Sequence, residues 1–488
     1  MKLSSYIKPV DARAILYYLA GALGLFGGAM LVPLGVSLAL GEYDHAVLLG
    51  LLAGGGLAVG FAGRALAARR LELQLPEALI VTAFVYLLFS LAGAVAFLPS
   101  GPYLHGLFEA MSGFTTTGLS MFDPDDLPLS LHFLRAYAQW LGGMGIVILS
   151  LAVLLGPGRA AFRLYSTEYG ERNIVGSVAA TAKIIIRIYV ILTAAGFLCF
   201  LAAGMKPFDA LIHIFTTVST GGFSRHAASI GHYPSTAVSL TVVLFMLLGA
   251  GSFPLYHAAV TRGAGSFFGD PQVRVLGLLV ALDALFFATR LGWEAGSITP
   301  GLFQAVSAVT TTGFSTLPSR EFSDAGMFLT TVLMVAGGCT GSTAGGIKLF
   351  RVLILAGFVK AALFRPVLPA GAEIPLGAGG IRVTRNEAAL AAAFFTLYLV
   401  IITVSTFALL WMEGTGFGET LFEVASAQGT VGLSSGITAP GLRTASKLVL
   451  IVNMWLGRLE IIPVLVALNP GVWARKLQAV RNQRRRKG

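Results

Sequence analysis

The chain repeats one short phrase four times, as LFEAMSGFTTTGLS at 107–120, LIHIFTTVSTGGFS at 211–224, LFQAVSAVTTTGFS at 302–315 and LFEVASAQGTVGLS at 421–434. Each copy begins with Leu, has Ser or Thr five residues later, and closes on Gly, then Leu or Phe, then Ser. The glycines in register are Gly118, Gly222, Gly313 and Gly432. A short helix that runs into a Thr/Gly turn, present four times, predicts four walls around one central site.

The composition places this chain in a membrane. Of its 488 residues, 56% are hydrophobic and only 12% are charged, whereas a soluble domain has about 25% charged residues. Apolar stretches of the ~20 residues that cross a bilayer recur along the whole sequence. The N-terminus is polar and shows no cleavable signal pattern. Cys199 and Cys339 have neither CxxC spacing nor a pairing framework, so disulfides and zinc are not expected.

The charged residues indicate the orientation in the membrane. We expect ten spans, at residues 13–40, 47–68, 77–98, 130–156, 183–204, 236–261, 273–291, 325–363 (interrupted), 386–412 and 443–469. Ten spans put both termini on one side, and the polar segments of that side hold 26 of the 34 Lys and Arg. This side is therefore cytoplasmic. The net charge of +11 is therefore explained by the orientation of the chain in the membrane, and nucleic-acid binding is not expected.

The four phrases all fall in non-cytoplasmic connections, each between two spans. The predicted fold is an all-α polytopic membrane protein with about ten transmembrane helices, in which four pseudo-symmetric span–pore helix–span repeats surround a central pore. The predicted segments are an N-terminal helix pair at 1–70, repeats at 71–165, 175–265, 268–365 and 380–472, and a basic tail at 473–488. The tail is expected to lie against anionic lipid headgroups, with docking of a cytosolic partner as the alternative.

The chemistry of the turns predicts a site for a monovalent cation. Each phrase is too short to span, so it should re-enter the membrane, where non-helical backbone is tolerated only inside protein or beside water. Backbone carbonyls and Thr hydroxyls from four turns can replace the hydration shell of a potassium ion, whereas carboxylate rings suit other cations. The alternative is four ordinary turns, which the common register disfavours. The predicted filter residues are Thr115, Thr116, Thr117, Gly118, Ser219, Thr220, Gly221, Gly222, Thr310, Thr311, Thr312, Gly313, Gly429, Thr430, Val431 and Gly432.

Two features that occur once each are candidates for a gate. The eighth span is interrupted by GGCTGSTAGG at 337–346, which cannot form a lipid-facing helix. We interpret it as a flexible loop below the filter; close helix packing through small residues is the alternative. Arg458 lies deep in the last span, where an unpaired charge is costly, so it should face a cavity or a partner rather than snorkel to the interface. The predicted gating residues are Gly337, Gly338, Thr340, Gly341, Ser342, Thr343, Gly345, Gly346 and Arg458.

Thr430-Val431-Gly432 matches the first half of the potassium-channel filter sequence TVGYG. With the four-fold arrangement, the chain resembles the Trk/Ktr/HKT superfamily of cation transporters, and its extra N-terminal pair resembles the bacterial TrkH/TrkG membrane subunits. The resemblance implies four filter glycines of the potassium-selective type, a gating loop in the third repeat and a pore-facing Arg458. It further implies a homodimer in the bacterial inner membrane and a cytosolic TrkA-like ring that binds NAD or ATP.

Other polar residues have weaker interpretations. Glu109, His213, Gln304 and Glu423 each stand nine residues before a filter glycine, and bracing of the filter is favoured over ion contact. The acidic group Asp123, Asp125 and Asp126 either attracts cations at the outer mouth or forms a solvated loop. The segment 142–145, GGMG, is expected to pack closely near the pore.

The sequence therefore predicts potassium uptake through a gated pore. We find no HExxH or Walker A sequence, so an enzyme is not expected, although an intramembrane enzyme is the contrasting class. A sodium-coupled or less selective monovalent cation transporter is the nearer alternative. No cofactor is expected in this chain, and potassium is its expected cargo.

Overall fold

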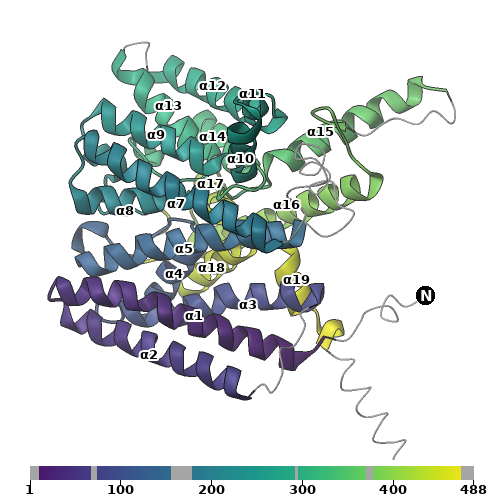
Figure 1. Ribbon diagram of the computed structural model, residues 1–488. Helices are drawn as coiled ribbons and strands as arrows, with labels where there is room; N and C mark the ends of the chain where they lie inside the picture. Colours follow the sequence, from purple (N-terminus) through teal and green to yellow (C-terminus); the bar gives the residue numbers. More distant parts are fainter. Residues whose placement is uncertain (1–9, 67–73, 155–177, 292–294, 370–376, 474–488) are drawn as a thin grey trace, which may run out of the picture.

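The computed structural model describes residues 10–66, 74–154, 178–291, 295–369 and 377–473. The basic tail from residue 474 onward and the segment 155–177 lie outside these ranges. The described chain is almost entirely helical, and its helices run roughly side by side (Figure 1). Its strands β1 (Gly377–Ala378) and β2 (Ile381–Arg382) form one short antiparallel hairpin.

The N-terminal pair consists of α1 (Ala12–Ala39) and α2 (Tyr43–Leu66). Asp11 caps α1, because its side chain accepts a hydrogen bond from the backbone N–H of Arg13 at 3.1 Å. The two helices meet through small residues. A Cβ built on Gly27 would lie 2.5 Å from the nitrogen of Leu57, so the two backbones are in contact.

Four consecutive groups of helices follow, each made of an outer helix, a short helix and an inner helix. The short helices have 12 to 15 residues, or about 18–23 Å at 1.5 Å per residue, and therefore cannot cross a bilayer core of about 30 Å. The groups are α3 (Leu75–Gly93, extended by η2, Ala94–Phe97), α4 (Tyr103–Phe114) and α5 (Leu129–Leu154); α7 (Val178–Ala202), α8 (Pro207–Val218) and α9 (Thr236–Ala250); α12 (Pro271–Leu291), α13 (Ala295–Val309) and α14 (Asp324–Ala336); and α16 (Arg385–Glu413), α17 (Phe417–Gly429) and α18 (Thr444–Arg458).

Shorter elements complete the described chain. Three of them are single 3-10 turns in the outer connections between short and inner helices: η3 (Pro124–Asp126), η4 (Ser229–His232) and η5 (Ser319–Glu321). The others follow the inner helices: α10 (Phe253–Arg262), α11 (Gly265–Phe268), α15 (Leu349–Phe364), η6 (Arg365–Val367) and α19 (Ile462–Leu468). Figure 1 shows α15 and the neighbouring part of α16 projecting together beyond the rest of the bundle.

The membrane-spanning character is confirmed by helix length and composition. Six described helices are long and apolar enough to cross a membrane, or up to eight if each of two sharply bent pairs is one span. The two remaining expected spans, 130–156 and 325–363, correspond to α5 and to the interrupted pair α14 and α15. The chain is thus a polytopic, helical membrane protein.

Two spans that the sequence predicts as continuous are broken. The predicted span 236–261 bends by 93° between α9 and α10, and the predicted span 443–469 bends by 116° between α18 and α19. A proline stands in the first turn after each break, Pro254 and Pro463, where its missing N–H is tolerated. Arg458 is consequently the last residue of α18 and does not lie within an unbroken helix.

Two of the short helices have a proline near their start. Pro207 is the first residue of α8, whereas Pro300 lies inside α13, which starts at Ala295. A proline so near a helix start removes one backbone hydrogen bond close to the end that is already incompletely bonded, so the helix tolerates it.

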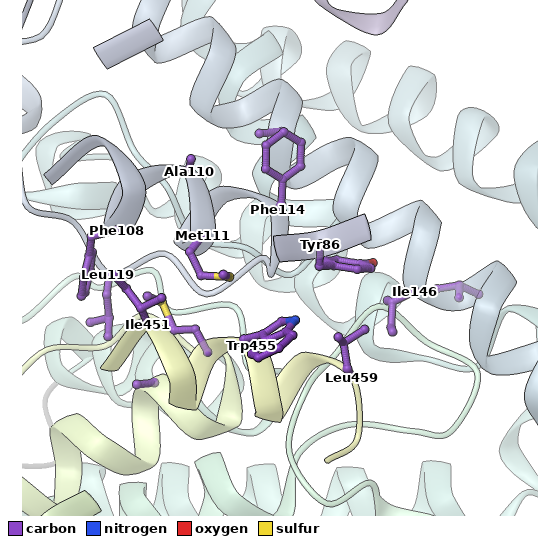
Figure 2. Close-up of a cluster of buried hydrophobic side chains, with 14 of the residues drawn as sticks. Tyr86, Phe108, Ala110, Met111, Phe114, Leu119, Ile146, Ile451, Trp455 and Leu459 are labelled. Atoms are coloured by element: carbon purple, nitrogen blue, oxygen red, sulfur yellow. The ribbon is translucent and has the colours of Figure 1, made fainter. Parts of the chain in front are cut away.

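The fourth group closes against the first through a large buried core. Figure 2 shows Ile451 and Trp455 of α18 on the side of α4 that carries Met111, with Tyr86 of α3 beside Trp455. The indole Nε1–H of Trp455 donates to the carbonyl oxygen of Ala83 at 2.9 Å, so this aromatic ring is buried without an orphaned donor. This contact joins segments that are far apart in the sequence into one ring of repeats.

The contact between α1 and α2 generates a testable prediction. Gly27→Leu places a side chain against the backbone of α2, and overpacking of this kind costs about 1–3 kcal/mol. We expect a lower melting temperature of the detergent-solubilised protein. Gly28→Leu is the matched control, since no described heavy atom lies within 4 Å of a Cβ built there. Equal melting temperatures for the two variants would contradict the close contact.

Candidate cation site

The four Thr/Gly turns share one backbone conformation. In each turn the residue two positions before the glycine has a positive φ: +52° at Thr116, +51° at Thr220, +53° at Thr311 and +50° at Thr430. The glycines that follow have φ between +75° and +100°, which only glycine adopts without strain. The residue before each glycine donates its N–H to the carbonyl of the Ser or Thr five positions earlier, over 2.7–3.0 Å: Thr117 to Ser112, Gly221 to Thr216, Thr312 to Ser307 and Val431 to Ser426.

These turns meet in a closed ring. A Cβ added to Gly118 would strike the carbonyl oxygen of Gly221, and one added to Gly222 would strike that of Thr312. The same relation continues from Gly313 to Val431 and from Gly432 back to Thr117. Each glycine therefore faces a carbonyl oxygen of the next repeat, in the order one, two, three, four, one. We call the carbonyls of Thr117, Gly221, Thr312 and Val431 the carbonyl ring.

An outer cavity opens directly onto this ring. It has a volume of about 270 Å³, and all four glycines line it together with Ser120, Ser224, Ser315 and Ser434. The structure thus brings Gly118, Gly222, Gly313 and Gly432 to one place, accessible from one side.

The threonine hydroxyls of the turns differ in their hydrogen-bond partners. Thr115 and Thr310 bond within their own turns, to Thr117 at 2.8 Å and to Thr312 at 2.8 Å. The hydroxyls of Thr116 and Thr430 are buried and have no hydrogen-bond partner among the described residues. Such a group is costly unless water or an ion satisfies it, so these two hydroxyls are available to a polar partner.

The four equivalent residues on the short helices bond to the chain that leaves each turn. Glu109 accepts from the N–H of Met121 at 3.0 Å and from Nε of Arg135 at 2.6 Å. Glu423 accepts from the N–H of Ser435 at 2.7 Å. His213 bonds the hydroxyl of Ser224 at 3.1 Å, and Gln304 donates to the carbonyl of Leu317 at 2.8 Å. All four side chains are buried, and these contacts are those of a brace.

The Gly-rich loop lies directly against the Thr/Gly turns. Its Thr343 hydroxyl bonds to the carbonyls of Val218 and Gly249, both at 2.9 Å. The N–H of Gly345 donates to the hydroxyl of Thr311 at 2.6 Å, and that of Gly346 donates to the carbonyl of Gly429 at 3.1 Å. The loop is therefore held by the inner ends of repeats two, three and four. Gly337, Gly338, Gly341 and Ser342 belong to the same buried segment, whereas the N–H of Thr340 bonds to Gln272 of α12.

Arg458 connects this loop to the first repeat. Its guanidinium is buried and donates to the carbonyl of Thr343 at 2.7 Å and to the carbonyl of Gly142 at 3.3 Å. The hydroxyl of Tyr86 donates to the same Gly142 carbonyl at 3.1 Å. Gly142 is itself closely packed, since a Cβ there would strike the carbonyl of Phe114. Arg458 thus bonds the loop from below instead of reaching the interface.

The outer mouth carries mixed charges. Arg135 and Arg320 line the cavity together with His226. Asp125 lies 3.5 Å from Nδ1 of His226, while Asp123 accepts from the N–H of Asp125 and caps its own turn. Burial lowers the pKa of His226, and the neighbouring His232 lowers that pKa further, so the imidazole is neutral near neutral pH. Protonation at lower pH would add positive charge to the mouth.

Two sets of residues at the site were missed by the sequence analysis. Gln139 of α5 donates to the Gly221 carbonyl of the ring at 2.6 Å. Glu460, which follows α18, forms an ion pair with Arg351 of α15 at 2.5 Å. The sequence hints at Gln139 only because the other inner helices carry methionine at the equivalent position. Nothing in the sequence near Arg351 or Glu460 indicates that these two residues form an ion pair.

Comparison with known proteins agrees with this architecture. A family model described as "TrkH: Cation transport protein" matches residues 58–289 and 293–471. The Trk system potassium uptake protein TrkH of Halomonas elongata is 32% identical over 492 residues, which cover 95% of this chain and 100% of the relative. The corresponding TrkH of Vibrio parahaemolyticus is 33% identical over 432 residues, covering 82% of this chain and 87% of that protein.

A solved structure leads to the same result. The crystal structure of the potassium transporter TrkH from Vibrio parahaemolyticus superposes with a TM-score of 0.84 at 30% identity, covering 95% of this chain and 100% of that one. The match extends over the N-terminal pair as well as the four repeats. By family model, by relatives over most of its length and by fold, this chain belongs to the TrkH family of cation transport proteins.

Proposed function

We propose that this chain is the membrane subunit of a bacterial Trk system and takes up potassium through a gated pore. The observation that carries the proposal is the closed carbonyl ring, in which four repeats each present one backbone oxygen next to a glycine of their neighbour. Neutral oxygens in this number can substitute for the hydration shell of a monovalent cation. Relatives named as potassium uptake proteins support the choice of ion.

Permeation requires no bond chemistry. A hydrated ion would enter the outer cavity, exchange water for the carbonyl ring, and then reach the unpartnered hydroxyls of Thr116 and Thr430. The C-terminal ends of the four short helices add partial negative charge at the same place. Below them, the loop around Thr343 and the guanidinium of Arg458 obstruct the path, sterically and by charge.

The proposed setting is the cytoplasmic membrane, with both termini on the cytoplasmic side. The asymmetric distribution of Lys and Arg supports this orientation. We also propose assembly as a homodimer and regulation by a cytosolic TrkA-like subunit, for which the Trk-system names of the relatives are the support. Because the chain contains no nucleotide-binding motif, regulation by nucleotide would have to come from that partner.

Uptake of ⁸⁶Rb⁺ into proteoliposomes that contain this chain tests the proposal. We expect uptake that unlabelled K⁺ inhibits at lower concentration than Na⁺ does, since four glycines leave the ring open to the larger ion. Equal inhibition by the two ions would favour the less selective cation transporter. Stimulation of K⁺ uptake by a Na⁺ gradient would favour the sodium-coupled one.

Gly313→Ala tests the ring itself. The new Cβ would strike the Val431 carbonyl and lie 2.9 Å from the Cα of Gly432. Displacing one ligand oxygen at a cost of ~1.4 kcal/mol lowers ion occupancy about ten-fold, and we expect ⁸⁶Rb⁺ uptake to fall by at least that factor. Gly204→Ala is the control. Gly204 also has a positive φ, +102°, but no described heavy atom lies within 4 Å of its added Cβ. A similar loss in both variants would attribute the effect to backbone strain alone.

Arg458→Ala tests the obstruction. Removing the guanidinium deletes its bond to the Thr343 carbonyl and one positive charge below the filter, so we expect ⁸⁶Rb⁺ uptake to rise several-fold. Arg443→Ala removes an exposed charge at the other end of the same helix and should leave uptake unchanged. Unchanged or lower uptake by a well-expressed Arg458→Ala protein would contradict the gating role.

A further inference from the structure

One buried position of the four inner helices carries a different kind of residue in the first repeat. They align on the small-residue steps LGG at 141–143, LGA at 248–250, AGG at 336–338 and LGR at 456–458. Two positions before each step, three of the helices carry methionine: Met246, Met334 and Met454. The first helix carries Gln139 there. All four side chains are fully buried, so this amide occupies a place that is apolar in every other repeat.

Both ends of the Gln139 amide are bonded to the filter turn of repeat two. Its Nε2 donates to the carbonyl oxygen of Gly221 at 2.6 Å, and its Oε1 accepts from the N–H of Phe223 at 3.2 Å. The amide therefore clamps the chain on either side of Gly222. A Cβ on Gly221 would collide with the Gln139 side chain, so the glycine is what lets the amide reach its carbonyl.

This clamp makes one member of the carbonyl ring unlike the others. Within the described ranges, no side chain donates to the carbonyls of Thr117, Thr312 or Val431. A carbonyl oxygen has two lone pairs, so Gly221 can still face an ion, but its position is fixed by the amide. A smaller cation is bound well only if the surrounding oxygens move inward. A carbonyl tethered to α5 resists that movement, which penalises Na⁺ more than K⁺.

We propose that Gln139 is a positioning residue that sets the ion selectivity of the filter by tethering the Gly221 carbonyl. The inference rests on the proposed function, because its ligand is the ion that passes this ring. Loss of the tether should leave a pore that conducts but discriminates less. The predicted size is that of one lost hydrogen bond, about a five-fold change in the ratio of inhibition constants.

Gln139→Met supplies the test, because methionine has a similar length and stands at the equivalent position of the other three repeats. The measurement is inhibition of ⁸⁶Rb⁺ uptake into proteoliposomes by K⁺ and by Na⁺, in wild type and variant. We expect the ratio of the Na⁺ to the K⁺ inhibition constant to fall about five-fold. Met454→Leu, an apolar exchange at the equivalent point of α18, is the matched control and should keep the wild-type ratio.

The outcomes separate a positioning role from general damage. A Gln139→Met protein that loses uptake but keeps the wild-type ratio would overturn the inference, since damage to folding lowers transport of all ions alike. If Gln139→Met does not yield folded protein, Gln139→Asn replaces it in the same measurement. Its amide is one methylene too short to reach the Gly221 carbonyl, so the same fall in the ratio of inhibition constants is expected. A wild-type protein without potassium preference would overturn the proposed function instead. The Gln139 inference is judged by whether the ratio changes between wild type and variant, whichever ion is preferred.

Discussion

The close approach of one glycine in each Thr/Gly turn to a carbonyl oxygen of the next repeat is the contact on which the rest of the structure depends. Any side chain at Gly118, Gly222, Gly313 or Gly432 would occupy the space of that oxygen. The ring closes only if turns that are 91 to 314 residues apart in the sequence arrive at the same depth. The short helices fix that depth, and the core between α18 and α4 joins the last repeat to the first (Figure 2).

Holding four backbone turns in this geometry requires buried polar braces, and the repeats meet that need differently. Glu109 is paired with Arg135, so its charge is compensated where it is buried. Glu423 accepts from the hydroxyls of Ser434 and Ser435 and from backbone N–H groups, which are neutral donors. His213 and Gln304 serve the same positions without a carboxylate. The carbonyl ring is thus four-fold in its backbone and asymmetric in the charge behind it.

The features that repeat along the sequence were the predictable ones. Four glycines in register imply one ring because only a shared geometry explains the shared spacing, and the Gly-rich break implies a loop because glycine cannot sustain a lipid-facing helix. Contacts between distant side chains left no such signal. Gln139 and Gly221 are 82 positions apart, and Arg351 and Glu460 are 109 apart. The bends after α9 and α18 had a local signal in Pro254 and Pro463, but each long apolar run favoured a continuous span.

The interruptions beneath the filter follow from the same membrane constraint. In repeats two, three and four the inner helices end at Ala250, Ala336 and Arg458, close to one aligned level, whereas α5 continues to Leu154. Helix ends at membrane depth leave carbonyls that lipid cannot satisfy. The Gly-rich loop satisfies some of these carbonyls. The backbone N–H of Cys339 donates to the carbonyl oxygen of Ala250, and the Thr343 hydroxyl donates to the carbonyl oxygen of Gly249. If the loop moved away from the ring, these groups would lose their partners and would need water in their place.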